Sequence, residues 1–153
     1  MACFLTTARL ALLAALQADA TLNAAIRTWF DWGPGLRKRY EIAPRNCPLL
    51  SVLPAELDAD QFANVMARLP QDLEIGIAVD GPDVAPLEEL VAAALDVIQA
   101  ESRTCLSVAL AEDGLTGIEI LRVQWQAVED EKAARVRWEA LIVCRINWMR
   151  LTH

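Results

Sequence analysis

Apolar and polar residues alternate over a long stretch near the C-terminus of the chain. From Val136 to Trp148 every second residue is apolar, and charged residues such as Arg137 and Glu139 fall between them. This period of two is typical of a β-strand with one buried face. A strand over residues 135–149 spans about 50 Å at about 3.3 Å per residue, whereas a domain of this chain length is about 40 Å across. We therefore expect a hairpin that extends beyond its own domain, the alternative being a strand that bends or breaks at a bulge.

Three shorter segments also carry strand patterns. Residues 48–54 form an apolar stretch bounded by two prolines, and residues 73–79 alternate up to an Asp-Gly turn signal. Residues 118–127 alternate as well, with a change of phase near Leu121. Because one extra residue changes the phase of a strand, we expect a β-bulge at Leu121.

Two segments have the period of an amphipathic helix, namely residues 6–18 and residues 85–102. A short helical turn capped by Asp19 follows the first, and residues 58–69 suit a brief helix or a loop. Strands joined by hairpins and gathered with two main helices indicate the α+β class. The sequence therefore predicts one domain over residues 1–153: a mostly antiparallel sheet with a long C-terminal β-hairpin, packed against two main helices.

The composition favours association with other proteins. Apolar residues make up 55% of the chain, yet charged residues interrupt each apolar run before the roughly 18 residues that a membrane span needs. The first twenty residues resemble a secretory signal, but Arg9 lies inside the apolar run and no positive charge precedes it. We expect a first helix there instead. The four cysteines are scattered without a Cys-x-x-Cys pair, as expected of buried thiols in a reducing compartment.

Charge is unevenly distributed along the chain, whose net charge is −7. Residues 1–50 hold six basic and three acidic side chains, residues 51–101 hold one and eleven, and residues 102–153 hold seven of each. Twelve of the fourteen basic residues are arginine, which is enriched at protein interfaces. This balance does not favour nucleic-acid binding through a basic face.

No pattern of catalytic or metal-binding residues is present. The only histidine is His153, the last residue, which makes a Ser-His-Asp or Cys-His relay implausible. Lys38 follows a Gly-Pro-Gly sequence without the spacing of a Walker A loop, and the adjacent Glu88 and Glu89 are explained by the positive end of a helix dipole. We expect no enzyme activity, no metal site and no cofactor, a carboxylate-only hydrolase being the remaining enzymatic alternative.

Two groups of residues are candidates for contact with partners. The first is an aromatic and basic loop, because Trp, Tyr and Arg are the commonest residue types at interface hot spots. The alternatives for this loop are a base-stacking surface, or aromatic side chains that fold back onto the core. The second group is the charged tip of the C-terminal hairpin. The candidate interface residues are Trp29, Phe30, Trp32, Arg37, Lys38, Arg39 and Tyr40 in the loop, and Glu129, Asp130, Glu131, Lys132, Arg135 and Arg137 in the hairpin.

The order of these segments is similar to that of a known family. The resemblance rests on an Ala- and Leu-rich first helix, the segment "LQADATLNAAIR", the proline-containing segment "APRNCPLLSV", a second helix and the ending "VRWEALIVCRINW". In these features the chain resembles the tail terminator (minor tail) proteins of long-tailed bacteriophages. The loop "WFDWGPGLRKRY" is longer than is usual for that family.

The resemblance implies a structural virion protein at the head-proximal end of the tail, present in the host cytoplasm during assembly. Such a protein forms a homo-oligomeric ring, usually hexameric, that binds the tail tube protein at the end of the completed tube and stops its polymerisation. The ring also offers a docking surface to the head-tail connector protein, and DNA passes through its channel without specific binding. An acidic channel wall would suit that passage. DNA phosphates and carboxylates are both negatively charged, so the wall would not bind DNA by the counterion release that drives binding to basic surfaces.

Two other structural roles stay open. One is a head-tail connector or completion protein of the same particles. The other is a small cytosolic α+β protein-binding module.

Overall fold

The computed structural model describes residues 4–30, 44–54, 71–103, 115–130 and 135–148. Its helices and strands follow the order that the sequence pattern predicts, with one additional strand. The elements are α1 (Phe4–Ala18), α2 (Ala20–Ala25), β1 (Thr28–Phe30), the 3-10 turn η2 (Pro44–Asn46), β2 (Leu49–Pro54), β3 (Gln71–Asp80), α4 (Ala85–Arg103), β4 (Leu115–Asp130) and β5 (Arg135–Trp148). The segment 58–69, predicted as a helix or loop, lies outside the described residues.

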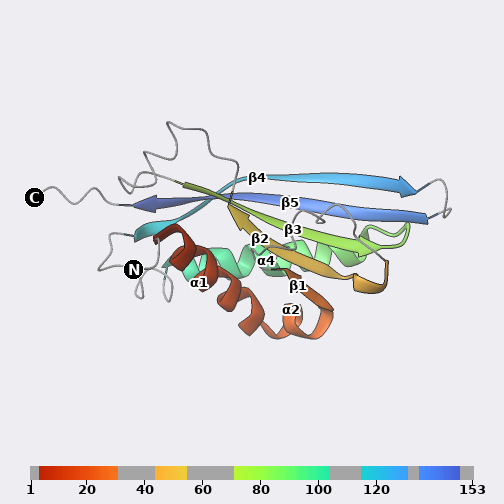
Figure 1. Cartoon of the computed structure of the whole chain (residues 1–153), viewed down its shortest axis with the longest axis horizontal. Coiled ribbons are helices and arrows are strands. Elements are labelled where there is room, and N and C mark those ends of the chain that lie inside the picture. Colours follow the sequence, from red (N-terminus) through yellow and green to blue (C-terminus); the bar gives the residue numbers. More distant parts are fainter. Residues whose placement is uncertain (1–3, 31–43, 55–70, 104–114, 131–134, 149–153) are drawn as a thin grey trace, which may run out of the picture.

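The described strands form a single sheet in the order β1-β2-β3-β5-β4. Its neighbouring strands are antiparallel except for β1 and β2, which are parallel. Helices α1, α2 and α4 lie on one face of this sheet (Figure 1). The predicted α+β class, with a mostly antiparallel sheet and a long C-terminal β-hairpin, is confirmed.

The hydrophobic core lies between the sheet and the helices. Alternate residues of β3 and β5 point toward the helices, and the apolar stripes of α1 and α4 cover them. Each large aliphatic side chain buried here stabilises the fold by about 1.5–3 kcal/mol. The buried residues that meet in this layer include Leu12, Leu16, Leu73, Ile75, Ile77, Leu87, Leu90, Val91, Ala94, Ile98, Ala140, Ile142, Cys144 and Ile146.

The short helix α2 begins at the predicted cap. The Asp19 carboxylate accepts a hydrogen bond from the Leu22 backbone N–H at 3.0 Å. The N–H of Ile26 in turn donates to the Leu22 carbonyl and ends the helix. A side-chain cap of this kind satisfies one of the donors that the first turn of a helix leaves free.

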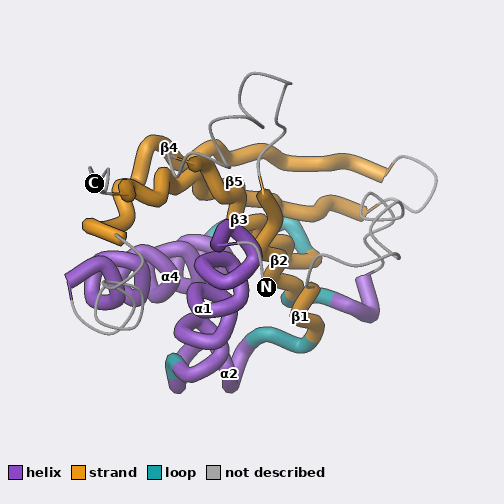
Figure 2. The backbone as a smooth tube through the Cα atoms, turned by 60° about the vertical axis from the view of Figure 1, so that its left-hand side comes forward, coloured by secondary structure: helices purple, strands orange, loops and turns teal. Residues whose placement is uncertain are grey.

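The long strand β5 has a partner along most of its length, so the expected extension of the hairpin beyond its domain is limited to its end. β3 pairs with β5 from Arg137 to Ile146, so only two residues at each end of β5 extend past β3. On its other side, β4 pairs with β5 throughout (Figure 2). β5 needs its length because it lies between two long neighbours, and only the end of the hairpin projects past α4 (Figure 1).

The predicted bulge in β4 is confirmed. The pairing of β4 with β5 shifts by one residue between Ile120 and Arg122, which leaves Leu121 without a directly opposed residue. Before the shift Ile118 and Ile120 face the helices, and after it Val123 does so. The bulge therefore changes which side chains of β4 face the core.

The strand β1 was not predicted. Thr28 and Trp29 pair in parallel with Leu49 and Leu50 of β2, and the Arg27 backbone N–H donates to the Pro48 carbonyl. Three residues are too few to show an alternating pattern, and the pairing depends on a segment distant in sequence. Trp29 and Phe30, expected in a loop, lie in this edge strand.

Candidate assembly interface

The second half of β4 is open to solvent on both faces of the sheet. β4 is an edge strand, and Gln124, Trp125, Gln126 and Ala127 are all exposed although they alternate between the two faces. An edge strand also presents backbone donors and acceptors along its outer side. Residues 124–127 therefore form the longest run of exposed residues within the described strands.

Trp125 is the main apolar feature of this surface. Its side chain is 44% exposed, and it stands opposite Ala140 of β5 on the helix side of the sheet. Two residues earlier, Val123 packs against the core. Trp125 is thus less covered by its own subunit than Val123, and a partner can bury its exposed part.

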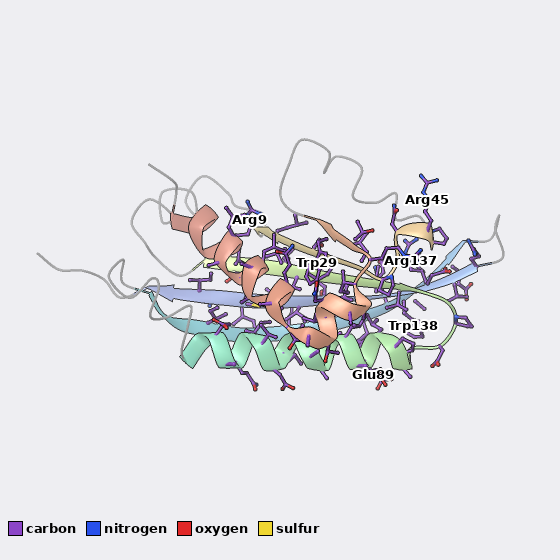
Figure 3. All side chains as sticks on the ribbon, turned by 90° about the horizontal axis from the view of Figure 1, so that it is seen from below. Arg9, Trp29, Arg45, Glu89, Arg137 and Trp138 are labelled. Atoms are coloured by element: carbon purple, nitrogen blue, oxygen red, sulfur yellow. The ribbon has the colours of Figure 1, made fainter. Side chains whose placement is uncertain are left out.

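The nearby Trp138 has a structural role within the subunit. Its indole Nε1–H donates to the Pro82 carbonyl at 2.9 Å, and the Gly81 N–H donates to the Val136 carbonyl at 2.8 Å. Gly81 has a φ of 116°, a conformation that side chains disfavour. Together these contacts tie the turn between β3 and α4 to the hairpin (Figure 3).

A polar network covers the hairpin on the face without helices. The Arg137 Nε lies 2.9 Å from the Glu139 Oε1, and the Gln126 Nε2 donates to the Glu139 Oε2 at 2.7 Å. The side chains of Arg137 and Glu139 are only 22% and 19% exposed. Arg137, predicted as an interface residue, is therefore engaged inside its own subunit.

The other predicted hairpin residues lie toward the free end. Arg135 is exposed, with its Nη2 atom 3.9 Å from the Asp80 Oδ2, and Glu129 is exposed on β4. Asp130 pairs with Arg135 in the last rung of the ladder. Glu131 and Lys132 lie outside the described residues. Glu129 and Arg135 thus share the hairpin with Trp125, a residue that the sequence pattern does not single out.

In the aromatic group, Trp29 contacts the core. Its side chain is half-buried and packs against the main hydrophobic cluster (Figure 3). This position agrees with the alternative of an aromatic side chain folded onto the core. The remaining candidates of the predicted loop lie outside the described residues: Trp32, Arg37, Lys38, Arg39 and Tyr40.

The described residues show neither a metal-binding group nor a membrane-spanning helix. Within these ranges no three His, Cys, Asp or Glu residues gather in a way that could hold a metal ion. No described helix is both long and apolar enough to cross a membrane.

Two buried cysteines have altered acidity. Burial raises the pKa of the Cys144 thiol from 9.0 to about 12, and the Asp72 carboxylate adds to the shift. Burial also raises the pKa of Cys47, as does the Asp80 carboxylate. Both thiols therefore stay protonated at neutral pH.

The Cys144 thiol makes stability fall at alkaline pH. A pKa raised by folding contributes stability fully below the unfolded value of 9.0, and this contribution is lost as the pH rises toward about 12. Between these limits we expect the free energy of unfolding to fall by about 2–4 kcal/mol more in the wild type than in Cys144→Ala. Urea denaturation at a series of pH values measures both curves. Parallel curves would contradict this prediction.

Sequence comparisons identify no family for this chain. No protein-family model matches it, and no curated protein does.

The fold is similar to that of a chain in a solved particle, the virion of a native gene transfer agent. The two chains have 22% sequence identity and a TM-score of 0.51. The match covers 88% of this chain and 90% of the other. The two proteins therefore share a fold over nearly their whole lengths.

Proposed function

We propose that this chain is a structural virion protein: a ring-forming tail terminator that caps the tail tube, stops its polymerisation and provides a docking surface for the head-tail connector. The ring is a homo-oligomer, hexameric in the tail, and DNA passes through its channel without specific binding. In this role the protein acts through its interfaces and without catalysis.

The observation that carries the proposal is the exposed second half of β4. It combines an unpaired strand edge with Trp125, a residue type frequent at interface hot spots. A ring needs such a surface on each subunit, because each subunit must contact the next. The shared fold with a chain of a virion supports the coarser part of the proposal, a structural virion protein.

Growth of tail tubes in vitro tests the function. The tail tube protein from the same particle is polymerised with and without this protein, and tube lengths are measured by electron microscopy. We expect shorter tubes with a ring at one end and six copies per capped tube by quantitative mass spectrometry. Unchanged tube lengths together with binding to isolated heads would favour the connector role instead. A single copy bound at each tube end would contradict the ring.

A further inference from the structure

The two edges of the sheet carry opposite charge. At the β1–β2 edge, defined here by β1 with the preceding Arg27, β2 and η2, Arg27 and Arg45 are both exposed. The Arg27 Nη1 donates to the Arg45 carbonyl at 3.0 Å, which holds the two arginines together although they are distant in sequence. The described part of this edge is therefore basic.

The opposite edge, here called the β4–α4 edge, combines acidic side chains of α4 with the exposed Trp125 of β4. Helix α4 exposes Glu88, Glu89 and Asp96 on its outer surface, and the small Ala92 is exposed between them. Among the charged residues of β4, Glu119, Arg122 and Glu129 are exposed, so acidic side chains outnumber basic ones along the described part of this edge. Figure 3 shows Glu89 and Arg45 pointing outward on opposite sides of the molecule.

We propose that the β4–α4 edge of one copy binds the β1–β2 edge of the next copy, with Arg27 and Arg45 facing Glu88 and Glu89 around Trp125. The inference rests on the proposed ring and identifies the two surfaces that form it. Its occupant is a second copy of this chain, because the opposite edge of the same fold supplies the matching charge.

Charge also selects the symmetry of the contact. A two-fold dimer through either edge would place like charges against each other, which destabilises an interface. A head-to-tail contact pairs unlike edges and can be repeated from copy to copy until a ring closes. The arrangement of charges therefore favours a ring over a symmetric dimer.

Trp125 supplies apolar contact area, and with it binding free energy that exposed ion pairs alone do not provide. Exposed pairs between carboxylates and guanidinium groups contribute little individually, because water and salt screen them. An exposed indole at the centre of the contact can be desolvated on binding, and an arginine of the neighbour can stack on its face. The charged side chains then form the rim that orients the two copies.

Charge reversal tests the pairing separately from net charge. Glu88→Arg with Glu89→Arg changes the net charge from −7 to −3, since each substitution adds two units. Arg27→Glu with Arg45→Glu changes it from −7 to −11 by the same arithmetic. The protein with all four substitutions returns to −7. If overall repulsion controlled association, the first variant would assemble better than the wild type.

We expect each double variant to weaken association by about tenfold or more, and the quadruple variant to recover it. An equimolar mixture of the two double variants should also assemble, because each supplies the edge that the other needs. Sedimentation velocity at about 0.15 M salt, where the Debye length is about 8 Å, measures association in solution. The number of subunits per tube end measures it on the tail. Thermal unfolding confirms that each variant is folded.

The outcomes separate the inference from the proposed function. Tubes capped by rings with all variants equally active would overturn the inference and leave the function standing. Charge-dependent self-association without any effect on tubes would support the inference and overturn the function. A wild-type protein that is monomeric at about 1 mM and bound singly at tube ends overturns both.

Discussion

Replacement of Trp29 by alanine is expected to lower the free energy of unfolding by about 3 kcal/mol. The indole packs against the main hydrophobic cluster, and its strand pairs with the buried Leu50. Truncation removes that packing and leaves a cavity, although the partial exposure of the side chain keeps the effect at the low end of the range for buried aromatic residues. Urea denaturation of the folded protein measures the change.

The matched control for this experiment is Trp125→Ala. This substitution removes the same atoms from an exposed position, and we expect it to change stability by less than about 1 kcal/mol. Equal effects at the two positions would mean that Trp29 is not a core residue. A stable Trp29→Ala protein that no longer binds tail tubes would instead show that Trp29 is a contact residue.

Trp125→Ala is expected to weaken assembly by about 2 kcal/mol, a factor of about 30 in the association constant. The loss arises because the indole supplies the apolar centre of the contact between subunits. Sedimentation velocity and ring occupancy at tube ends both report it. The protein should remain folded, because we expect its stability to change by less than about 1 kcal/mol.

Leu10 provides the control for Trp125. It is the other large hydrophobic side chain that is exposed among the described residues, at 42%, but it lies on α1 rather than on the β4–α4 edge. We expect Leu10→Ala to leave assembly unchanged. A similar loss with both variants would show that general surface hydrophobicity, and not the position of Trp125, controls association.

The sequence predicted the elements whose pattern is local. The helix over 6–18, the cap at Asp19 and the phase change at Leu121 correspond to observed features because the period of a helix or strand is written in consecutive residues. β1 was missed because its three residues become a strand only through Leu49 and Leu50 of β2. The overhang was overestimated because the alternation of one strand does not reveal the length of its neighbours.

The interface residues were predicted from residue type, and the structure shows only which of the described ones are accessible. Glu129 and Arg135 are exposed at the end of the hairpin, but Arg137 pairs with Glu139 two residues away. That pairing could have been anticipated, since residues i and i+2 of a strand share a face. The exposure of Trp125 could not be anticipated, because its alternating position in the sequence matches that of a buried residue.

The bulge at Leu121 gives the two halves of β4 different evolutionary freedom. Before it, Ile118 and Ile120 fill the core, where most substitutions cost stability. Beyond it, the backbone of Gln124, Trp125 and Ala127 pairs with β5 while their side chains are exposed, so their identity can drift at little cost to the fold. A lineage can thus adapt its contacts to a changing partner one substitution at a time. Loss of the extra residue at Leu121 would instead exchange the two faces of this surface in a single mutation.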